Sequence, residues 1–191
     1  MFADLNFSLN SGQIMQLAGA NGAGKTSLLR IIAGFSMPDE GDILYLNQSI
    51  KKYYEEYARD LLFIGHKTGV NVQLSALENV KHWLAINGYT NEGDLYPLLS
   101  KLGLVGLEDV PVRTLSAGQQ RRVALARLWL SEAKLWILDE PFTALDKSGV
   151  AFLQQRFVEH LNSGGAILLT THQDLTAHFS NLQTLTLEYR H

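Results

Sequence analysis

A glycine-rich segment, GANGAGKT at residues 19–26, is the clearest candidate for a chemical site in this sequence. The segment fits the phosphate-binding pattern G-x-x-x-x-G-K-[ST], in which glycines let successive backbone N–H groups point at phosphate oxygens. The lysine adds positive charge at the β- and γ-phosphates, the last hydroxyl suits Mg²⁺, and the helix that follows offers its positive N-terminal end. We therefore expect nucleotide phosphates to be bound by Gly19, Ala20, Asn21, Gly22, Ala23, Gly24, Lys25, Thr26 and Ser27, with Thr26 also a metal ligand.

A second candidate is the acidic pair Asp139-Glu140, which directly follows the apolar run 135–138. Ligands gather at the carboxyl ends of strands in parallel α/β sheets, so both carboxylates are expected beside the phosphates. There Asp139 can hold the Mg²⁺ hydration shell and Glu140 can polarise the attacking water. Without the phosphate loop the pair would be a weak signal, because acidic turns after buried strands are commonplace.

His172 stands at the end of another apolar run, residues 166–171. At the carboxyl end of a strand its imidazole could reach a γ-phosphate and sense its loss. The alternative is an ordinary surface histidine, and spacing alone does not decide between the two.

The segment LSAGQ at residues 115–119 also has two interpretations. Ser116 and Gln119 match a capping box, the S-x-x-Q pattern that opens a helix. The same serine, Gly118 and free helix N–H groups can also bind an anion.

The elements that must position these groups alternate between apolar strands and helices, which predicts an α/β fold with a mostly parallel sheet. Strands are expected at 5–9, 14–18, 42–46, 61–65, 134–139, 166–171 and 182–188. Helices are expected at 27–33, 50–59, 117–131 and 144–161, with the inward face of strand 5–9 including Phe7. We expect one domain over 1–191, with a core formed by 1–66 and 114–191 and a helical lobe at 67–113.

Composition narrows the function classes. Hydrophobic residues make up 46% and charged residues 18%, as in a chain that buries a core, and the net charge of -3 argues against a nucleic-acid partner. Cysteine is absent, which excludes disulfides and thiolate metal sites. No apolar run reaches the roughly 18 residues that would cross a bilayer.

Five motifs occur in the order found in ABC-transporter ATPase domains: GANGAGKT, LSAGQQRRVALARL, LWILDEP, TALD and TTHQ. The chain therefore resembles that branch of the P-loop NTPases, which implies a RecA-like core with a small antiparallel β portion and an inserted helical subdomain. The resemblance implies Mg-ATP hydrolysis in a head-to-tail homodimer, in which the LSAGQ of one subunit completes the ATP site of the other. By motif, the ATP contacts in trans are Ser116, Gly118 and Gln119; Asp139 serves Mg²⁺, Glu140 is the general base, Asp146 couples the two sites, and His172 is the switch histidine.

Two longer stretches, FIGHKTGVNVQLSALENV at 63–80 and LSAGQQRRVALARLWLSEAKLWILDEPFTALD at 115–146, resemble the CcmA family. These are the ATP-binding subunits of the bacterial cytochrome c maturation transporter, also called a haem exporter. The resemblance implies haem delivery or export, integral membrane partners like CcmB and CcmC, a functional link to the haem carrier CcmE, and a peripheral place on the cytoplasmic face of the inner membrane. His66 stands where ABC proteins usually have a glutamine. No haem ligand set is expected, with His82, His160 and His191 as surface residues.

Several alternatives stay open. The cargo could differ from haem, and the wider classes are a soluble ABC ATPase of DNA repair or translation and a catalytically dead nucleotide sensor. The first lacks its usual coiled coil or tandem cassette, and the second is disfavoured by Lys25, Asp139, Glu140 and His172. ABC domains usually place an adenine-stacking aromatic well before the phosphate loop; here only Phe2 and Phe7 precede it, so Met1 could be an internal methionine of a longer protein.

Overall fold

The computed structural model describes residues 4–89 and 93–188. The chain packs as two compact units. The first unit comprises Met1–His66, Glu132–Pro141 and Phe157–His191, and the second unit comprises Lys67–Ser131 and Phe142–Arg156. The subdomain boundaries expected from the sequence stay a prediction, because packing units need not follow the segment that is inserted in the chain.

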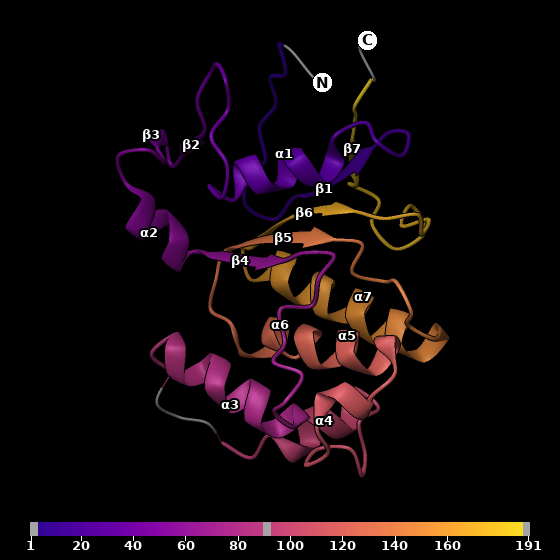
Figure 1. The fold of residues 1–191 in the computed structure, drawn as a ribbon. Coiled ribbons are helices and arrows are strands. Elements are labelled where there is room, and N and C mark those ends of the chain that lie inside the picture. Colours follow the sequence, from indigo (N-terminus) through magenta and orange to yellow (C-terminus); the bar gives the residue numbers. More distant parts are fainter. Residues whose placement is uncertain (1–3, 90–92, 189–191) are drawn as a thin grey trace. The chain divides into compact units, whose positions relative to one another are not determined.

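A parallel sheet forms the centre of the first unit (Figure 1). Its strands lie in the order β4 (Leu61–Ile64), β5 (Leu135–Asp139), β6 (Ala166–Thr170), β1 (Ile14–Ala18) and β7 (Gln183–Thr186). Each neighbouring pair is parallel, with Leu61 opposite Leu135, and Ile14 opposite Ile167. Parallel strands have their carboxyl ends at one edge, so the loops that follow β1, β4, β5 and β6 meet there. The expected α/β fold with a mostly parallel sheet is confirmed.

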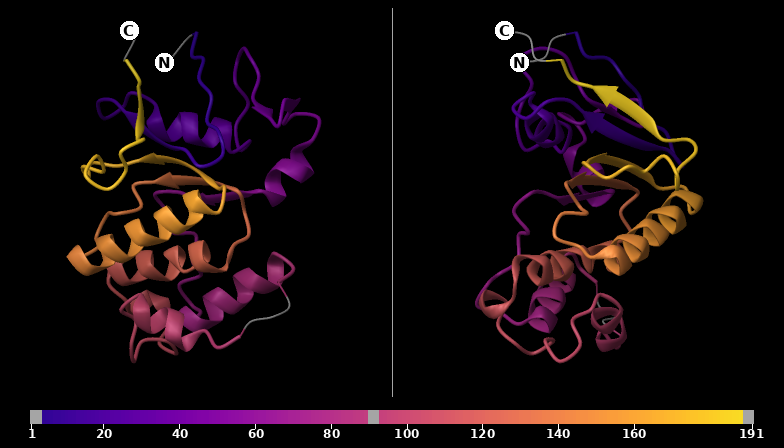
Figure 2. Two further views of the ribbon diagram at one scale, coloured as in Figure 1. Left: turned by 180° about the vertical axis from the view of Figure 1, so that it is seen from behind. Right: turned by 90° about the vertical axis from the view of Figure 1, so that its right-hand side faces the viewer.

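Helix α1 (Lys25–Ile32) supplies the apolar layer over this sheet. Its Leu28 and Leu29 are buried against Met15, Ile137 and Leu168 from three different strands. The remaining elements of the unit are α2 (Tyr54–Arg59) and an antiparallel pair of two-residue strands, β2 (Leu44–Tyr45) and β3 (Gln48–Ser49). Figure 2 shows the sheet from behind and from the side, with β7 at its edge next to β1.

Helices build the second unit: α3 (Ala76–Ile86), α4 (Tyr96–Lys101), the 3₁₀ turn η1 (Val112–Thr114), α5 (Ala117–Leu125) and α6 (Arg127–Leu130). Helix α7 (Lys147–Asn162) starts in this unit and ends in the first. A separate core joins the helices, centred on the buried residues Val80, Leu84, Leu99, Leu104 and Val123. Ser75 and Glu78 close a capping box at the start of α3.

The structure differs from the sequence prediction at several element boundaries. Residues 5–9 form no strand: Leu5 and Leu9 pack against the core, but Phe7 is 37% exposed. A strand needs a neighbouring strand to bond its backbone N–H and C=O groups. The short strands β2 and β3 do not serve residues 5–9 in this way, because they pair with each other. The helix expected at 117–131 is divided at Ala126, and α7 begins at Lys147 rather than 144.

His160 is a correction to the expected surface histidines. It is 6% exposed, and its ring stacks on Trp136 with ring centroids 3.6 Å apart. Buried positions of α7 at 153, 157 and 161 follow helical spacing, and residue 160 falls on the same face. His82 is exposed as expected, and His191 lies outside the described residues.

Across the described ranges 4–89 and 93–188, each helix is too short or too polar to span a lipid bilayer.

Candidate nucleotide site

The glycines of the loop after β1 adopt conformations that other residues rarely reach. Gly19 has φ +143, and a Cβ there would come within 2.7 Å of the Leu187 carbonyl oxygen, so only glycine fits. Gly24 has φ +93 and forms the N-cap of α1 without a side chain to cover the helix end. The first N–H groups of α1 are therefore open to an anion, as the sequence pattern predicts.

Lys25 lies over its own loop. Its Nζ donates hydrogen bonds to the carbonyl oxygens of Gly19 at 2.7 Å and Ala20 at 3.1 Å. These bonds hold the ammonium group at the mouth of the loop, where a phosphate oxygen would be its stronger partner, since hydrogen bonds between charged groups are the stronger kind.

Asp139 is fixed from both sides. Its carboxylate is 3% exposed; Thr26 Oγ1 donates to Oδ2 at 2.9 Å, and Thr170 Oγ1 donates to Oδ1 at 2.7 Å. Thr26 and Asp139, expected as metal residues, are thus in direct contact although 113 positions separate them.

A hydroxyl and a carboxylate are oxygen ligands, which suit Mg²⁺. Among the described residues there is no cluster of three or more His, Cys, Asp or Glu side chains that could hold a metal ion. The two oxygen donors, the Thr26 hydroxyl and the Asp139 carboxylate, fit an ion that takes its other ligands from nucleotide phosphates and water, the usual arrangement for Mg²⁺ at phosphates.

Glu140 and His172 lie beside each other, with 3.5 Å between Glu140 Oε1 and His172 Nε2. The glutamate side chain is 20% exposed and the histidine side chain 76%, so the imidazole is much more open to solvent than the carboxylate. Glu140 has φ +51, uncommon for a residue with a side chain, and its N–H donates to Thr170 Oγ1 at 2.9 Å.

These groups line one pocket of about 360 Å³, within the size range of ligand sites. All of its residues belong to the first unit: Asn21, Gly22, Gly24, Lys25, Thr26, Ser27, His66, Asp139, Glu140 and His172. The loop, the acidic pair, the histidine and His66 come from the ends of four parallel strands, so the sheet brings together the phosphate, metal and base candidates that the sequence predicted. Phe7 is not one of the residues that line this pocket, and Phe2 lies outside the described residues.

Ser116, Gly118 and Gln119 lie in the second unit at the start of α5. The capping box is present: Gln119 N–H donates to Ser116 Oγ at 3.3 Å, and Ser116 N–H donates to Gln119 Oε1 at 2.9 Å. A Cβ on Gly118 would come within 2.6 Å of the Ala144 carbonyl oxygen. Glycine at 118 thus lets α5 approach the backbone that precedes α7, and the exposed Ser116 faces solvent.

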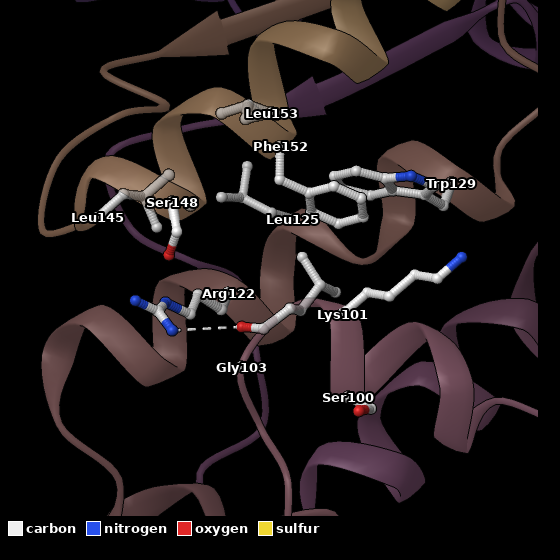
Figure 3. Close-up of a pocket in the computed structure, with 12 residues that line it drawn as sticks. Ser100, Lys101, Gly103, Arg122, Leu125, Trp129, Leu145, Ser148, Phe152 and Leu153 are labelled. Atoms are coloured by element: carbon white, nitrogen blue, oxygen red, sulfur yellow. Dashed lines mark hydrogen bonds between the residues drawn. The ribbon is translucent and has the colours of Figure 1, made fainter.

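The Asp146 carboxylate accepts hydrogen bonds from residues of the second unit. Gly149 N–H donates to its Oδ1 at 3.0 Å, which caps α7, and Arg122 donates from Nη2 at 2.9 Å. The Gly149 bond, more than the Arg122 charge, lowers the pKa of the Asp146 carboxyl. Arg122 also donates to the Leu102 carbonyl oxygen at 3.4 Å, drawn dashed in Figure 3, beside the stacked rings of Trp129 and Phe152. Arg122 thereby joins α5 to the ends of two other helices.

Two residues of these sites were missed by the sequence analysis, Thr170 and Arg122. Thr170 is polar at the last position of an otherwise apolar strand, directly next to the candidate histidine segment. That position was a usable signal, because a polar residue at a buried strand end needs a partner. Arg122 gave no such signal, since an arginine on a polar helix is ordinary.

Comparisons with known proteins agree with this geometry. The family model described as ABC transporter matches residues 2–143. The chain is 53% identical over 187 residues to the "Cytochrome c biogenesis ATP-binding export protein CcmA" of Aliivibrio fischeri, covering 98% of this chain and 92% of that protein. It is 49% identical over 190 residues to the protein of the same name from Escherichia coli, covering 98% and 89%.

Solved structures are also similar. A structure described as the ATP binding subunit of an ABC transporter has a TM-score of 0.81 at 27% identity, covering 95% of this chain and 77% of that one. A dimeric ATP-binding cassette in a post-hydrolysis state, bound to ADP and Pi, has a TM-score of 0.79 at 24% identity, covering 97% and 87%. At 24% identity, the similarity to the dimeric cassette shows a shared fold.

Proposed function

Because the chain belongs to the ABC transporter family, and within it to the CcmA proteins of cytochrome c biogenesis, we propose that it hydrolyses ATP to power haem delivery or export for c-type cytochromes. The observation that carries the chemical part is the meeting of Lys25, Asp139, Glu140 and His172 in one pocket. The relatives' name supports the biological part.

ATP binding starts from the phosphate loop. Lys25 exchanges its bonds to the Gly19 and Ala20 carbonyl oxygens for the β- and γ-phosphates, while the N–H groups at the start of α1 contact the same oxygens. The loop glycines Gly19, Gly22 and Gly24 already adopt positive φ angles, which residues with a side chain rarely reach.

Thr26 and Asp139 would hold Mg²⁺ between them, and Asp139 keeps its second oxygen on Thr170. When bound, the ion neutralises negative charge on the β- and γ-phosphate oxygens. The two protein groups would position the ion. Thr26 lies in the first turn of α1, at the end of the phosphate loop, and Asp139 is buried at the end of β5.

Glu140 is the proposed general base. It follows Asp139 directly, and its carboxylate lines the pocket with enough exposure to bind a water molecule. Its neighbour His172 can donate a hydrogen bond to the γ-phosphate and turn away when that group leaves, which its exposed ring permits. His66, at the end of β4, lines the same pocket and is proposed to couple nucleotide state to the membrane partner.

The second unit would act in trans. We propose a head-to-tail homodimer in which Ser116, Gly118 and Gln119 of one subunit contact the γ-phosphate bound to the other, and Asp146 couples the two sites. The exposure of Ser116 at a helix N-terminus supports this assignment, because it leaves the hydroxyl and nearby N–H groups available to an anion.

Integral membrane subunits like CcmB and CcmC, linked to the haem carrier CcmE, are the proposed partners, on the cytoplasmic face of the bacterial inner membrane. The helical subdomain at 67–113 is the proposed docking region for them. A transporter ATPase with a different cargo is the alternative that the site chemistry supports equally well, because Lys25, Asp139, Glu140 and His172 would act on ATP whatever the cargo.

Deletion of the gene in its host, with holo-cytochromes c measured by haem staining, tests the biological role. We expect holo-cytochromes to vanish and to return with the wild-type chain but not with Glu140→Gln. Holo-cytochromes that persist unchanged in the deletion strain would leave an ABC ATPase with another cargo.

A further inference from the structure

Thr170, the last residue of β6, connects the two acidic residues of the pocket. Its side chain is fully buried, and its Oγ1 donates to Asp139 Oδ1 at 2.7 Å. The same oxygen accepts the Glu140 N–H at 2.9 Å, and the Thr170 carbonyl oxygen accepts it at 3.2 Å. One hydroxyl group therefore contacts both residues that the proposed reaction uses.

The direction of these bonds is fixed. A backbone N–H only donates, so Thr170 Oγ1 accepts from Glu140 with a lone pair and gives its single hydroxyl proton to Asp139. Serine could make the same two bonds, whereas valine has the same shape and can make neither.

Glu140 needs such support because its backbone is in the left-handed region, with φ +51. Residues with a side chain adopt this region rarely, and they keep it when surrounding contacts hold them there. Both bonds from the Glu140 N–H end on Thr170, which places the glutamate side chain on the pocket side of the strand end.

Asp139 needs the same support for a different reason. Its Oδ2 contacts Thr26, which is exposed and is proposed to turn its oxygen to Mg²⁺, whereas its Oδ1 contacts the buried Thr170. When Thr26 binds the ion, Thr170 keeps the plane of the carboxylate fixed.

We infer that Thr170 is a positioning residue, which orients the Asp139 carboxylate toward the metal and the Glu140 backbone toward the attacking water. This inference rests on the proposed ATP hydrolysis, since it gives Thr170 a role within the site proposed for that reaction. A threonine that only satisfied a buried hydrogen bond would affect folding stability and every property of the site alike.

The test compares Thr170→Val with Thr170→Ser in the full chain. ATP binding is measured by calorimetry in EDTA and then in Mg²⁺, hydrolysis is measured against Mg²⁺ and ATP concentration, and the melting temperature is recorded. We expect Thr170→Val to keep Mg²⁺-free ATP affinity within about twofold. Its half-maximal Mg²⁺ concentration should rise about tenfold and its kcat should fall about tenfold or more, with KM for ATP changing less, because bonds to charged groups are lost. Thr170→Ser should restore most of both losses.

Wild-type kcat and Mg²⁺ dependence in Thr170→Val would overturn the inference. An equal loss of Mg²⁺-free binding, Mg²⁺-dependent binding and melting temperature would also overturn it, in favour of a structural role. If Thr170→Val does not fold, Thr170→Ala carries the same comparison. A wild-type chain that binds Mg-ATP without hydrolysing it would contradict the proposed function but still test Thr170 through Mg²⁺-dependent binding, and a chain that binds no ATP would overturn both.

Discussion

In the first unit, hydrogen bonds between segments far apart in the sequence hold the site residues, whereas in the second unit helix caps hold them. Asp139 is buried between hydroxyls from α1 and β6, so its place depends on contacts 113 and 31 positions away along the chain. Ser116 and Asp146 are exposed, and their bonds run to residues three positions away or to a neighbouring helix.

This difference indicates that the two units have different roles. A carboxylate fixed by buried bonds is preorganised for a metal ion and a developing charge, which is where fixed dipoles contribute most to catalysis. Exposed caps at a helix start cost little to form and leave donors available to an incoming group. The first unit therefore suits binding and chemistry, and the second suits the role proposed for it, which is to contact a nucleotide bound to another subunit.

The largest expected effect comes from Lys25→Ala, which removes the charge at the phosphate loop. ATP affinity, measured by calorimetry, should fall at least about hundredfold, because a charge-assisted bond to phosphate is lost. Lys52→Ala, an exposed lysine of the same unit, should leave the affinity unchanged. Tight binding by Lys25→Ala would refute the phosphate-loop assignment.

Ser116→Arg tests the second unit. In a mixed dimer with one variant subunit, hydrolysis at the opposite subunit's site should fall about hundredfold, because Ser116 is proposed to contact the nucleotide at that site and a bulky cation replaces it. Asn87→Arg places the same side chain elsewhere on the exposed surface of the second unit and should have no such effect. Unaltered hydrolysis in the Ser116→Arg mixed dimer would refute the proposal that the second unit contacts the nucleotide of the other subunit.

Gly118→Ala should destabilise the chain by about 1–3 kcal/mol, since the new methyl group would overlap the Ala144 carbonyl oxygen. Urea unfolding measures this loss. Ala117→Gly, at the neighbouring position, adds no atom and should cost no more than about 1 kcal/mol. Equal losses of stability in the two variants would mean that close packing against Ala144 is not the reason for a glycine at position 118.

The smallest effect concerns pH. Because the pKa of Asp146 is lowered in the folded chain, its contribution to stability is present above the usual carboxyl pKa of 3.8 and is lost as pH falls through the lowered value. Asp146→Asn keeps a helix cap but does not titrate, so its melting temperature should fall less than that of the wild type between neutral pH and about pH 3. An identical fall in both chains would contradict this.

The sequence predicted those parts of the fold that local pattern decides. The sequence pattern placed the ends of β1, β4, β5 and β6 within one residue and those of β7 within two residues. The S-x-x-Q pattern at 116–119 predicted a capping box that the structure contains. The carboxyl-end rule for parallel sheets was enough to bring Lys25, Asp139 and Glu140 together.

Contacts between distant segments could not be predicted in the same way. Thr170 contacts Asp139 because β6 lies next to β5 in the sheet. Local sequence patterns do not predict the order of strands in a sheet. Asp146 caps α7 and moves its start to Lys147, since a capping aspartate stands outside the helix that it begins. Strand 5–9 was predicted from alternation alone, which does not supply the partner that a strand requires.

We propose that the catalytic pocket of one subunit is completed by the second unit of another. Glu140→Gln tests it most directly, because this variant should bind Mg-ATP without hydrolysing it and so hold the dimer together. Size-exclusion chromatography with light scattering, at saturating Mg-ATP, should give the mass of a dimer for Glu140→Gln and of a monomer when ATP is omitted. A strictly monomeric mass for the ATP-saturated variant would contradict the account.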